Sequence, residues 1–263
     1  MNNKPLISYI LPTYQAASFI RNTMNRFSEY CSDSGLSSEI IIVNDGSTDS
    51  TDKIIKNYLQ ENKNRSIKYI NHTKNSGKGS AIKTGIQAAE GQYIVFTDCD
   101  LQYSFKNIRD VVNNLLNNNF NVVIASRMHK ESIYTIRSSN LSWIYIRHTS
   151  GRIYNYLINV FTNLYIEDTQ AGLKGFDAET AKLIFDKMTI KGFGFDVDVL
   201  VCAKVNNKKI TSIPVEFNYE HEMSTINFIR QTFVMTFDLL RIFFKRVTGH
   251  YRMKTTCNCT VEP

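Results

Sequence analysis

VFTDCDLQY, residues 95–103, joins an apolar β-strand pattern directly to two acids that stand one residue apart. Residues two apart in extended backbone point to the same side, so we expect Asp98 and Asp100 to face one cation together. Hard oxygen ligands suit Mg²⁺ or Mn²⁺, and Gln102 could supply a third oxygen. The alternative is a pair of solvated turn acids that cap a helix expected over 106–118.

Around this stretch, the chain alternates short β-rich runs with helical patterns. This alternation is typical of an α/β fold with a mostly parallel sheet flanked by helices. Further strands are expected at 8–11 (SYIL), 39–43 (EIIIV), 67–70 (IKYI), 121–125 (NVVIA) and 211–217 (TSIPVEF). Helices are expected at 49–61, 78–90, 140–164, 177–188 and 194–205. No Pro/Gly/Ser linker divides the chain, so we expect one domain over 1–252 and a disordered tail over 253–263.

Composition and charge narrow the classes of function. The 263 residues include 43% hydrophobic side chains, which indicates a folded chain, and a net charge of +7 suggests an anionic partner. No nucleic-acid-binding module appears, so we expect no nucleic-acid partner. No apolar run is long enough to span a membrane, no signal-peptide core is present, and the five cysteines are an odd number. We therefore expect a cytoplasmic location.

Polar clusters follow five of the predicted strands. Because ligands bind at the carboxyl ends of strands in open α/β sheets, these clusters predict one binding site. They are 12–14 (PTY), 44–47 (NDGS), 75–79 (NSGKG), 98–100 (DCD) and 126–127 (SR).

Two other phosphate-handling motifs fit the sequence poorly. A haloacid-dehalogenase-type phosphatase carries Asp-x-Asp on its first strand, whereas here it follows the fourth. A P-loop needs Gly at the position of His72 and Ser or Thr at the position of Gly79. Gly77 can still let the backbone approach a phosphate closely, with Lys78 as a counter-charge.

The ordered set of motifs resembles glycosyltransferase family 2, inverting GT-A enzymes that use nucleotide-diphospho-sugars. The motifs are ILPTYQ (10–15), IIIVNDGSTDST (40–51), NSGKGSAIKTGI (75–86), YIVFTDCDLQYS (93–104) and VIASR (123–127). DTQAGLK (168–174) and GFDVDVL (194–200) are similar to the branch that contains dolichyl-phosphate glucosyltransferases and bacterial polyprenyl-phosphate relatives. The resemblance covers roughly residues 6–252.

This resemblance implies roles for residues of a nucleotide-sugar half, about 1–127. Pro12, Tyr14 and Asp45 would line the nucleoside pocket, with Asp45 meeting the base. Asp98 would touch the ribose or the metal shell, and Asp100 and Gln102 would coordinate Mg²⁺ or Mn²⁺. From the residues alone, Asp45 could equally be the first-turn acid of the next helix.

The resemblance also implies a lipid-phosphate acceptor, bound by an acceptor half at about 128–225. A phosphate oxygen is already anionic, so attack on the sugar needs positioning and cations more than a strong base. Arg127 and Arg147 are our candidates for holding it, with Arg137 a weaker third. If the acceptor were a hydroxyl, Asp168 or Asp196 would have to act as general base; either could instead be a helix N-cap.

The expected reaction is metal-dependent transfer of a hexose, from UDP-glucose, to a polyprenyl or dolichyl-type phosphate. GDP-mannose as donor and a sugar hydroxyl as acceptor remain alternatives. A last helix, 226–247 within an amphipathic segment of about 226–250, stacks Ile229, Phe233, Phe237, Leu240, Phe244 and Val247 on one face. It could lie peripherally on the cytosolic face of a membrane, pack on its own domain, or do both.

Overall fold

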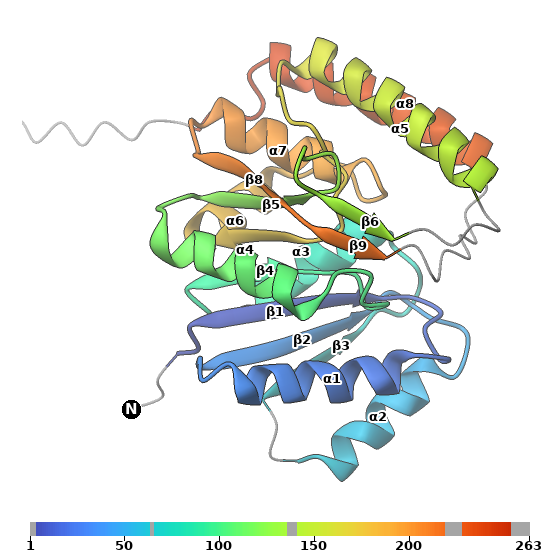
Figure 1. Cartoon of the computed structure of the whole chain (residues 1–263), viewed down its shortest axis with the longest axis vertical. Helices are drawn as coiled ribbons and strands as arrows, with labels where there is room; N and C mark the ends of the chain where they lie inside the picture. Colours follow the sequence, from blue (N-terminus) through green and yellow to red (C-terminus); the bar gives the residue numbers. More distant parts are fainter. Residues whose placement is uncertain (1–3, 64–65, 136–140, 219–227, 254–263) are drawn as a thin grey trace, which may run out of the picture.

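The computed structural model describes residues 4–63, 66–135, 141–218 and 228–253 (Figure 1). Its strands are β1 Ile7–Thr13, β2 Ser38–Asn44, β3 Ile67–Asn71, β4 Tyr93–Phe96, β5 Val122–Ser126, β6 Ile133–Thr135, β7 Lys174–Asp177, β8 Ile210–Pro214 and β9 Glu216–Asn218. Its helices are α1 Ile20–Asp33, α2 Thr51–Glu61, α3 Lys78–Ala88, α4 Phe105–Asn117, α5 Leu141–Thr162, α6 Ala178–Lys187, α7 Phe195–Val205 and α8 Phe228–Val247.

The main sheet has the order β3-β2-β1-β4-β7-β5-β8. Every pairing in it is parallel except those of β7, which lies antiparallel between β4 and β5. The predicted strands that correspond to β1 to β5 are confirmed. The sequence analysis missed β7, a four-residue strand that contains a fully buried lysine, Lys174, and therefore lacks an apolar pattern.

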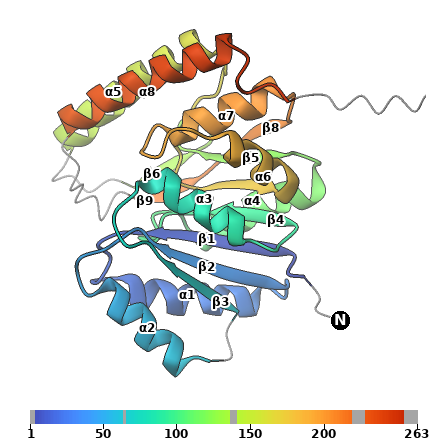
Figure 2. The same cartoon turned by 180° about the vertical axis from the view of Figure 1, so that it is seen from behind.

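Helices cover both faces of the sheet. Ile10 of β1 belongs to one core cluster with residues of α3, α6 and α7, while its neighbours Tyr9 and Leu11 belong to a second with residues of α1, α2 and α4. Figure 1 shows α1 and α4 in front of the sheet, and Figure 2, from behind, shows α3 and α6. The continuous apolar runs of the inner strands follow from this burial on both faces.

The prediction of one strand over 211–217 is wrong. β8 ends at Pro214 in the main sheet, and β9 begins at Glu216 and pairs in parallel with β6 in a separate two-stranded sheet. Proline has no N–H to donate to a strand ladder, so it favours a break there.

Helices α5 and α8 lie side by side at one end of the molecule in both views. Among the described residues, no helix is long and apolar enough to cross a membrane. The expected tail over 253–263 lies outside the described residues, apart from Met253. The division of the chain into a donor half and an acceptor half stays a prediction.

Candidate active site

Asp45, directly after β2, fixes the loop that leads into α3. Its carboxylate accepts hydrogen bonds from the backbone N–H groups of Ser76 at 2.9 Å and Gly77 at 2.8 Å, and lies 2.8 Å from Nδ1 of His72. The loop closes tightly, since Gly77 has φ of +96° and a Cβ there would lie 2.5 Å from the carbonyl oxygen of Lys191. Asp45 thus positions the N-terminus of α3, a role that the sequence analysis did not predict.

The other predicted nucleoside-binding residues lie at the end of β1. Pro12 is buried within the strand, and Tyr14, just beyond it, exposes 48% of its surface. A backbone bond of 2.8 Å from Asp45 N to Thr13 O joins the ends of β1 and β2, so these residues and Asp45 share one edge of the sheet. Their contact with a nucleoside stays a prediction.

The acidic pair lies in a turn, so the prediction of extended backbone for it is wrong. β4 ends at Phe96, and the chain turns through Leu101, which has φ of +56°. A bond of 2.7 Å from Thr23 Oγ1 to the carbonyl oxygen of Cys99 holds the turn against α1. The two carboxyl groups still affect each other: burial, together with the nearby charge of Asp98, raises the pKa of Asp100 to about 6.

The side chains of this turn fit a divalent cation that also binds substrate. Gln102 Nε2 lies 2.8 Å from Asp100 Oδ2, which brings the three predicted metal ligands into one small region. Within the described ranges, no three His, Cys, Asp or Glu side chains are placed so that they could together hold a metal ion, so a cation here would depend on the two carboxylates and the amide. Two carboxylates and an amide suit Mg²⁺ or Mn²⁺, which takes remaining ligands from phosphates and water, and a cation would relieve the repulsion between the acids.

Two lysines form ion pairs with acids near this turn. Lys78 Nζ lies 2.5 Å from Asp98 Oδ1; burial opposes its charge, but Asp98 and Asp196 outweigh burial and raise its pKa. Lys174 is fully buried, with Nζ 2.5 Å from Asp196 Oδ1 and 2.6 Å from the carbonyl oxygen of Ala171. Burial raises the pKa of the Asp196 carboxyl, and the Lys174 charge opposes that shift.

Sequence reasoning missed Lys174 as a site residue. Its signal was present at the end of the quoted motif DTQAGLK, where the lysine stands between the apolar residues AGL (171–173) and GF (175–176). A lysine in such a run needs a buried partner, because an unpaired buried charge is very unfavourable. The partner, Asp196, is 22 residues away, and only the fold brings the two together.

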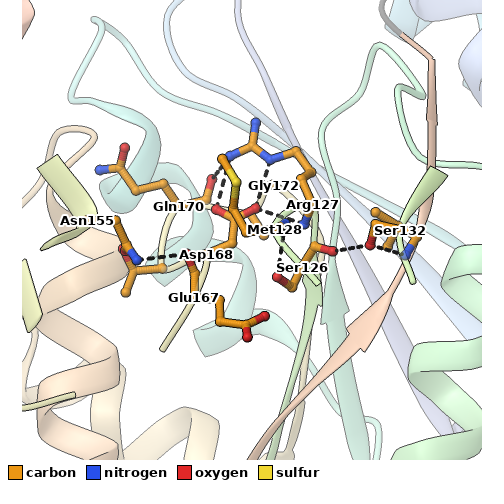
Figure 3. Close-up of polar contacts among 12 residues, drawn as sticks. Ser126, Arg127, Met128, Ser132, Asn155, Glu167, Asp168, Gln170 and Gly172 are labelled. Atoms are coloured by element: carbon orange, nitrogen blue, oxygen red, sulfur yellow. Dashed lines mark hydrogen bonds and ion pairs between the residues drawn. The ribbon is translucent and has the colours of Figure 1, made fainter. Parts of the chain in front are cut away.

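Arg127, at the end of β5, forms a two-pronged ion pair with Asp168 (Figure 3). Its Nε and Nη2 lie 2.9 and 3.1 Å from the two carboxylate oxygens, and its backbone N–H donates to Oδ2 at 3.0 Å. Burial alone would raise the pKa of Asp168, but Arg127 more than compensates and holds that pKa below its usual range. Both residues were predicted from the sequence as site residues, but their pairing was not.

A cavity of about 400 Å³ lies beside this ion pair. Its wall combines the start of the segment after β5, one side of α5 and the loop before β7; it includes Arg127, Arg152, Asn155, Tyr156, Asp168 and Gln170. Asn155 Nδ2 ties α5 to the loop by donating to the carbonyl oxygens of Ile166 at 2.9 Å and Glu167 at 2.7 Å. Arg147 lies in α5 with its side chain outside the described part, and Arg137 lies outside the described residues altogether.

The loop before β7 connects the acidic turn to the arginine-lined cavity. Gly172 N–H donates to the hydroxyl of Tyr103 at 3.1 Å, and a Cβ on Gly172 would lie 2.1 Å from Asp98 Oδ2. Asp168, four residues earlier in the same loop, holds Arg127. The structure therefore brings the acidic turn, the half-buried Lys78, the buried Lys174 and the Arg127–Asp168 pair together, and Asp45 joins them through the loop that it holds.

Known glycosyltransferases are similar to this chain in sequence. The glycosyl transferase family 2 model matches residues 8–184. A dolichyl-phosphate beta-glucosyltransferase of Dictyostelium discoideum is 29% identical over 220 residues, covering 82% of this chain and 66% of that protein. One from Trichomonas vaginalis is 30% identical over 245 residues, covering 90% and 72%, and one from Homo sapiens is 28% identical over 260 residues, covering 95% and 78%. The chain thus spans about two thirds of the length of the first of these relatives.

Solved structures share the fold. Glucosyl-3-phosphoglycerate synthase from Mycobacterium tuberculosis, in complex with Mn²⁺, UDP and glucosyl-3-phosphoglycerate, has a TM-score of 0.63 and 17% identity, covering 92% of this chain and 80% of that one. A mannosyltransferase from Pyrobaculum calidifontis, in complex with GDP-Man and Mn²⁺, has a TM-score of 0.60 and 18% identity, covering 94% and 65%. At this level of identity the likeness establishes the fold alone.

Proposed function

Because the chain belongs to glycosyl transferase family 2, we propose that it transfers glucose from UDP-glucose to a polyprenyl or dolichyl-type phosphate, with inversion at the sugar. The observation that carries this proposal is the loop before β7, which has the acidic turn on one side and an arginine-lined cavity on the other. A metal-bound diphosphate donor would fit the first, and an anionic acceptor would bind the arginines of the second, whose lining also includes Glu167 and Asp168.

On the donor side, Asp98, Asp100 and Gln102 would hold Mg²⁺ or Mn²⁺. The metal would neutralise charge on the departing nucleoside diphosphate. Lys78, 2.5 Å from Asp98, would add a fixed positive charge at the N-terminus of α3, where backbone N–H groups also favour an anion. Pro12, Tyr14 and Asp45 would bind the nucleoside at the ends of β1 and β2.

On the acceptor side, Arg127 would bind the lipid phosphate, and Asp168 would orient its guanidinium. A planar guanidinium held along one edge by a carboxylate has a defined direction, which favours a productive approach of the phosphate oxygen to the sugar. Arg152, exposed on the same cavity wall, would add positive charge, and Arg147, which lies in the same helix, stays a predicted acceptor-binding residue.

The ion pairs and the burial of Asp168 and Asp196 favour a phosphate over a hydroxyl acceptor. A general base must accept a proton, yet the pKa of Asp168 is held low and its carboxylate already accepts three N–H groups of Arg127. The pKa of Asp196 is raised by burial, but this carboxyl is 5% exposed and already pairs with Lys174 Nζ at 2.5 Å, which disfavours its contact with an acceptor hydroxyl. A phosphate oxygen needs neither acid as a base, since it is already ionised.

We further propose that the reaction takes place at the cytosolic surface of a membrane, since the acceptor's hydrocarbon chain requires a lipid phase. The three cysteines that the structure describes, Cys31, Cys99 and Cys202, are all free, which suits a reducing compartment.

Transfer of labelled hexose into a lipid-extractable product tests the proposal. Purified protein is incubated with Mn²⁺, a polyprenyl phosphate and either UDP-glucose or GDP-mannose. We expect product from UDP-glucose only, lost on chelation. Product from GDP-mannose alone would overturn the donor assignment, and donor turnover that yields only a glycosylated hydroxyl would overturn the acceptor.

A further inference from the structure

Helices α5 and α8 form a parallel pair on the surface of the core. Tyr154 Oη donates to the carbonyl oxygen of Met235 at 2.8 Å, and the rings of Phe161 and Phe243 pack edge to face with centroids 5.8 Å apart. The contact farther along α5, at Phe161, is also the contact farther along α8, at Phe243, so the two helices run in the same direction. Their inner sides are buried at residues such as Ile158 and Ile242.

The outer sides of the same two helices are apolar and exposed. Of the twelve large hydrophobic side chains found exposed within the described ranges, eight belong to this pair: Tyr156, Leu157 and Val160 on α5, and Val234, Phe237, Leu240, Phe244 and Val247 on α8. Spacings of three and four residues put the α8 members on one helical face, opposite the buried Leu239 and Ile242. The apolar face predicted for 226–247 is therefore, as far as it is described, the face turned away from the core.

The charges around this surface suit anionic lipid. The α5 sequence contains no acid, and the one acid of α8, Asp238, is 6% exposed. Basic residues accompany the apolar ones: Arg241 has a side chain that is 70% exposed, and Lys245 is in the last turn of α8, whereas Arg246 of the same turn donates to the carbonyl oxygen of Phe161 on α5 at 3.3 Å. Exposed aromatic and aliphatic residues with basic neighbours are typical of helices that lie in the headgroup region of an anionic bilayer.

The apolar surface is continuous with the cavity beside Arg127. Tyr156, which is 69% exposed, belongs to the outer side of α5 and also lines the cavity, as does Arg152. A phosphate at Arg127 could therefore carry a hydrocarbon chain that leaves the cavity past Tyr156 into a bilayer in contact with α5 and α8.

We propose that the outer face of the α5–α8 pair docks on an anionic lipid bilayer and that the lipid acceptor enters the cavity from this side, past Tyr156. The docking surface can be tested without turnover; the entry route rests on the proposed function.

Vesicle co-sedimentation tests the docking. The full chain is mixed with vesicles of phosphatidylcholine containing about 30% phosphatidylserine, an anionic surface of the kind that attracts basic helices. We expect the wild type to bind, and the double variant Phe237→Ser/Phe244→Ser to bind more weakly by on the order of tenfold or more, since two exposed phenylalanines no longer enter the lipid. Ile133→Ser, which changes a 62% exposed side chain on β6, should bind like the wild type.

Two readouts separate this proposal from the proposed reaction. With a short, water-soluble prenyl phosphate the double variant should transfer glucose at the wild-type rate, while transfer to the vesicle-borne acceptor falls. Vesicle binding without any transfer would retain the docking surface and overturn the reaction. Equal vesicle binding by the wild type and the double variant would overturn the docking. So would a wild type that does not bind vesicles but forms a dimer that the double variant does not form.

Discussion

Gly172 lacks a side chain at a point where the carboxylate of Asp98 fills the space a side chain would need. A Cβ there would lie 2.1 Å from Asp98 Oδ2, far inside van der Waals contact. We expect Gly172→Ala to displace the Asp98 carboxylate and lower the affinity for Mn²⁺ about tenfold or more, while circular dichroism remains that of the wild type. Gly192→Ala, where nothing lies within 4 Å of the added Cβ, is the matched control. Unchanged metal affinity in Gly172→Ala would mean that Asp98 is not a ligand.

Substitution of Arg127 tests the proposed binding of the acceptor phosphate. Lysine keeps the charge but cannot reproduce the two-pronged contact with Asp168, whose bonds are 2.9 and 3.1 Å long. We expect Arg127→Lys to lower kcat for the lipid phosphate at least tenfold and to cost about 1–3 kcal/mol of stability, because the buried Asp168 loses a bonded partner. Arg21→Lys alters an exposed ion pair with Glu61 and should change neither quantity measurably. Wild-type kcat in Arg127→Lys would exclude Arg127 from acceptor binding.

Among the elements, α3 approaches α7 closely enough to require a glycine in its first turn. A Cβ on Gly79 would lie 2.5 Å from Cβ of Phe195, the first residue of α7. We expect Gly79→Ala to destabilise the protein by about 1–3 kcal/mol, because overpacking outweighs the better helix propensity of alanine. Gly151→Ala in α5, which meets nothing within 4 Å, should instead stabilise it by about 0.4–1 kcal/mol. Denaturant unfolding measures both, and a neutral Gly79→Ala would contradict the close packing.

Some of these elements could be predicted from the sequence and others could not. Local periodicity predicts strands β1 to β5 and the expected helices. The parallel arrangement of the strands predicts that the polar clusters at their ends meet at one edge of the sheet. β7 was missed because its place in the sheet comes from antiparallel pairing with distant strands. The Arg127–Asp168 pair joins residues 41 apart in the chain, so no local pattern could predict it. For α8, periodicity predicted an apolar face, but only packing against α5 and the core shows that this face is outermost.

Across the whole molecule, Glu39 links three strands and the end of α3. It is 5% exposed, accepts a bond of 2.6 Å from Ser8 Oγ on β1 and one of 2.8 Å from Glu90 N, and lies 2.8 Å from Lys68 Nζ on β3. Burial alone would raise the pKa of its carboxyl, but the bonds from Lys68, Ser8 and Glu90 outweigh burial and lower that pKa.

Stability should therefore depend on pH through Glu39. A lowered folded-state pKa stabilises the fold above the unfolded value of about 4.3, and this contribution is lost as the pH falls through the folded-state value. We expect Glu39→Gln to be less stable than the wild type by about 1–3 kcal/mol at pH 7 and to lose less stability than the wild type below about pH 5. Denaturant unfolding across this range measures both, and parallel pH profiles would contradict the assignment.

The central claim is that the acids after β4 bind the metal-diphosphate part of a nucleotide sugar, and calorimetric titration of UDP-glucose tests it most directly. We predict that Mn²⁺ tightens binding to the wild type by about tenfold or more, or about 1.4 kcal/mol. Asp100→Asn should lose this response, whereas Asp110→Asn, on α4, should keep it. Equal affinity with Mn²⁺ and with a chelator in the wild type, or a full response in Asp100→Asn, would contradict the claim.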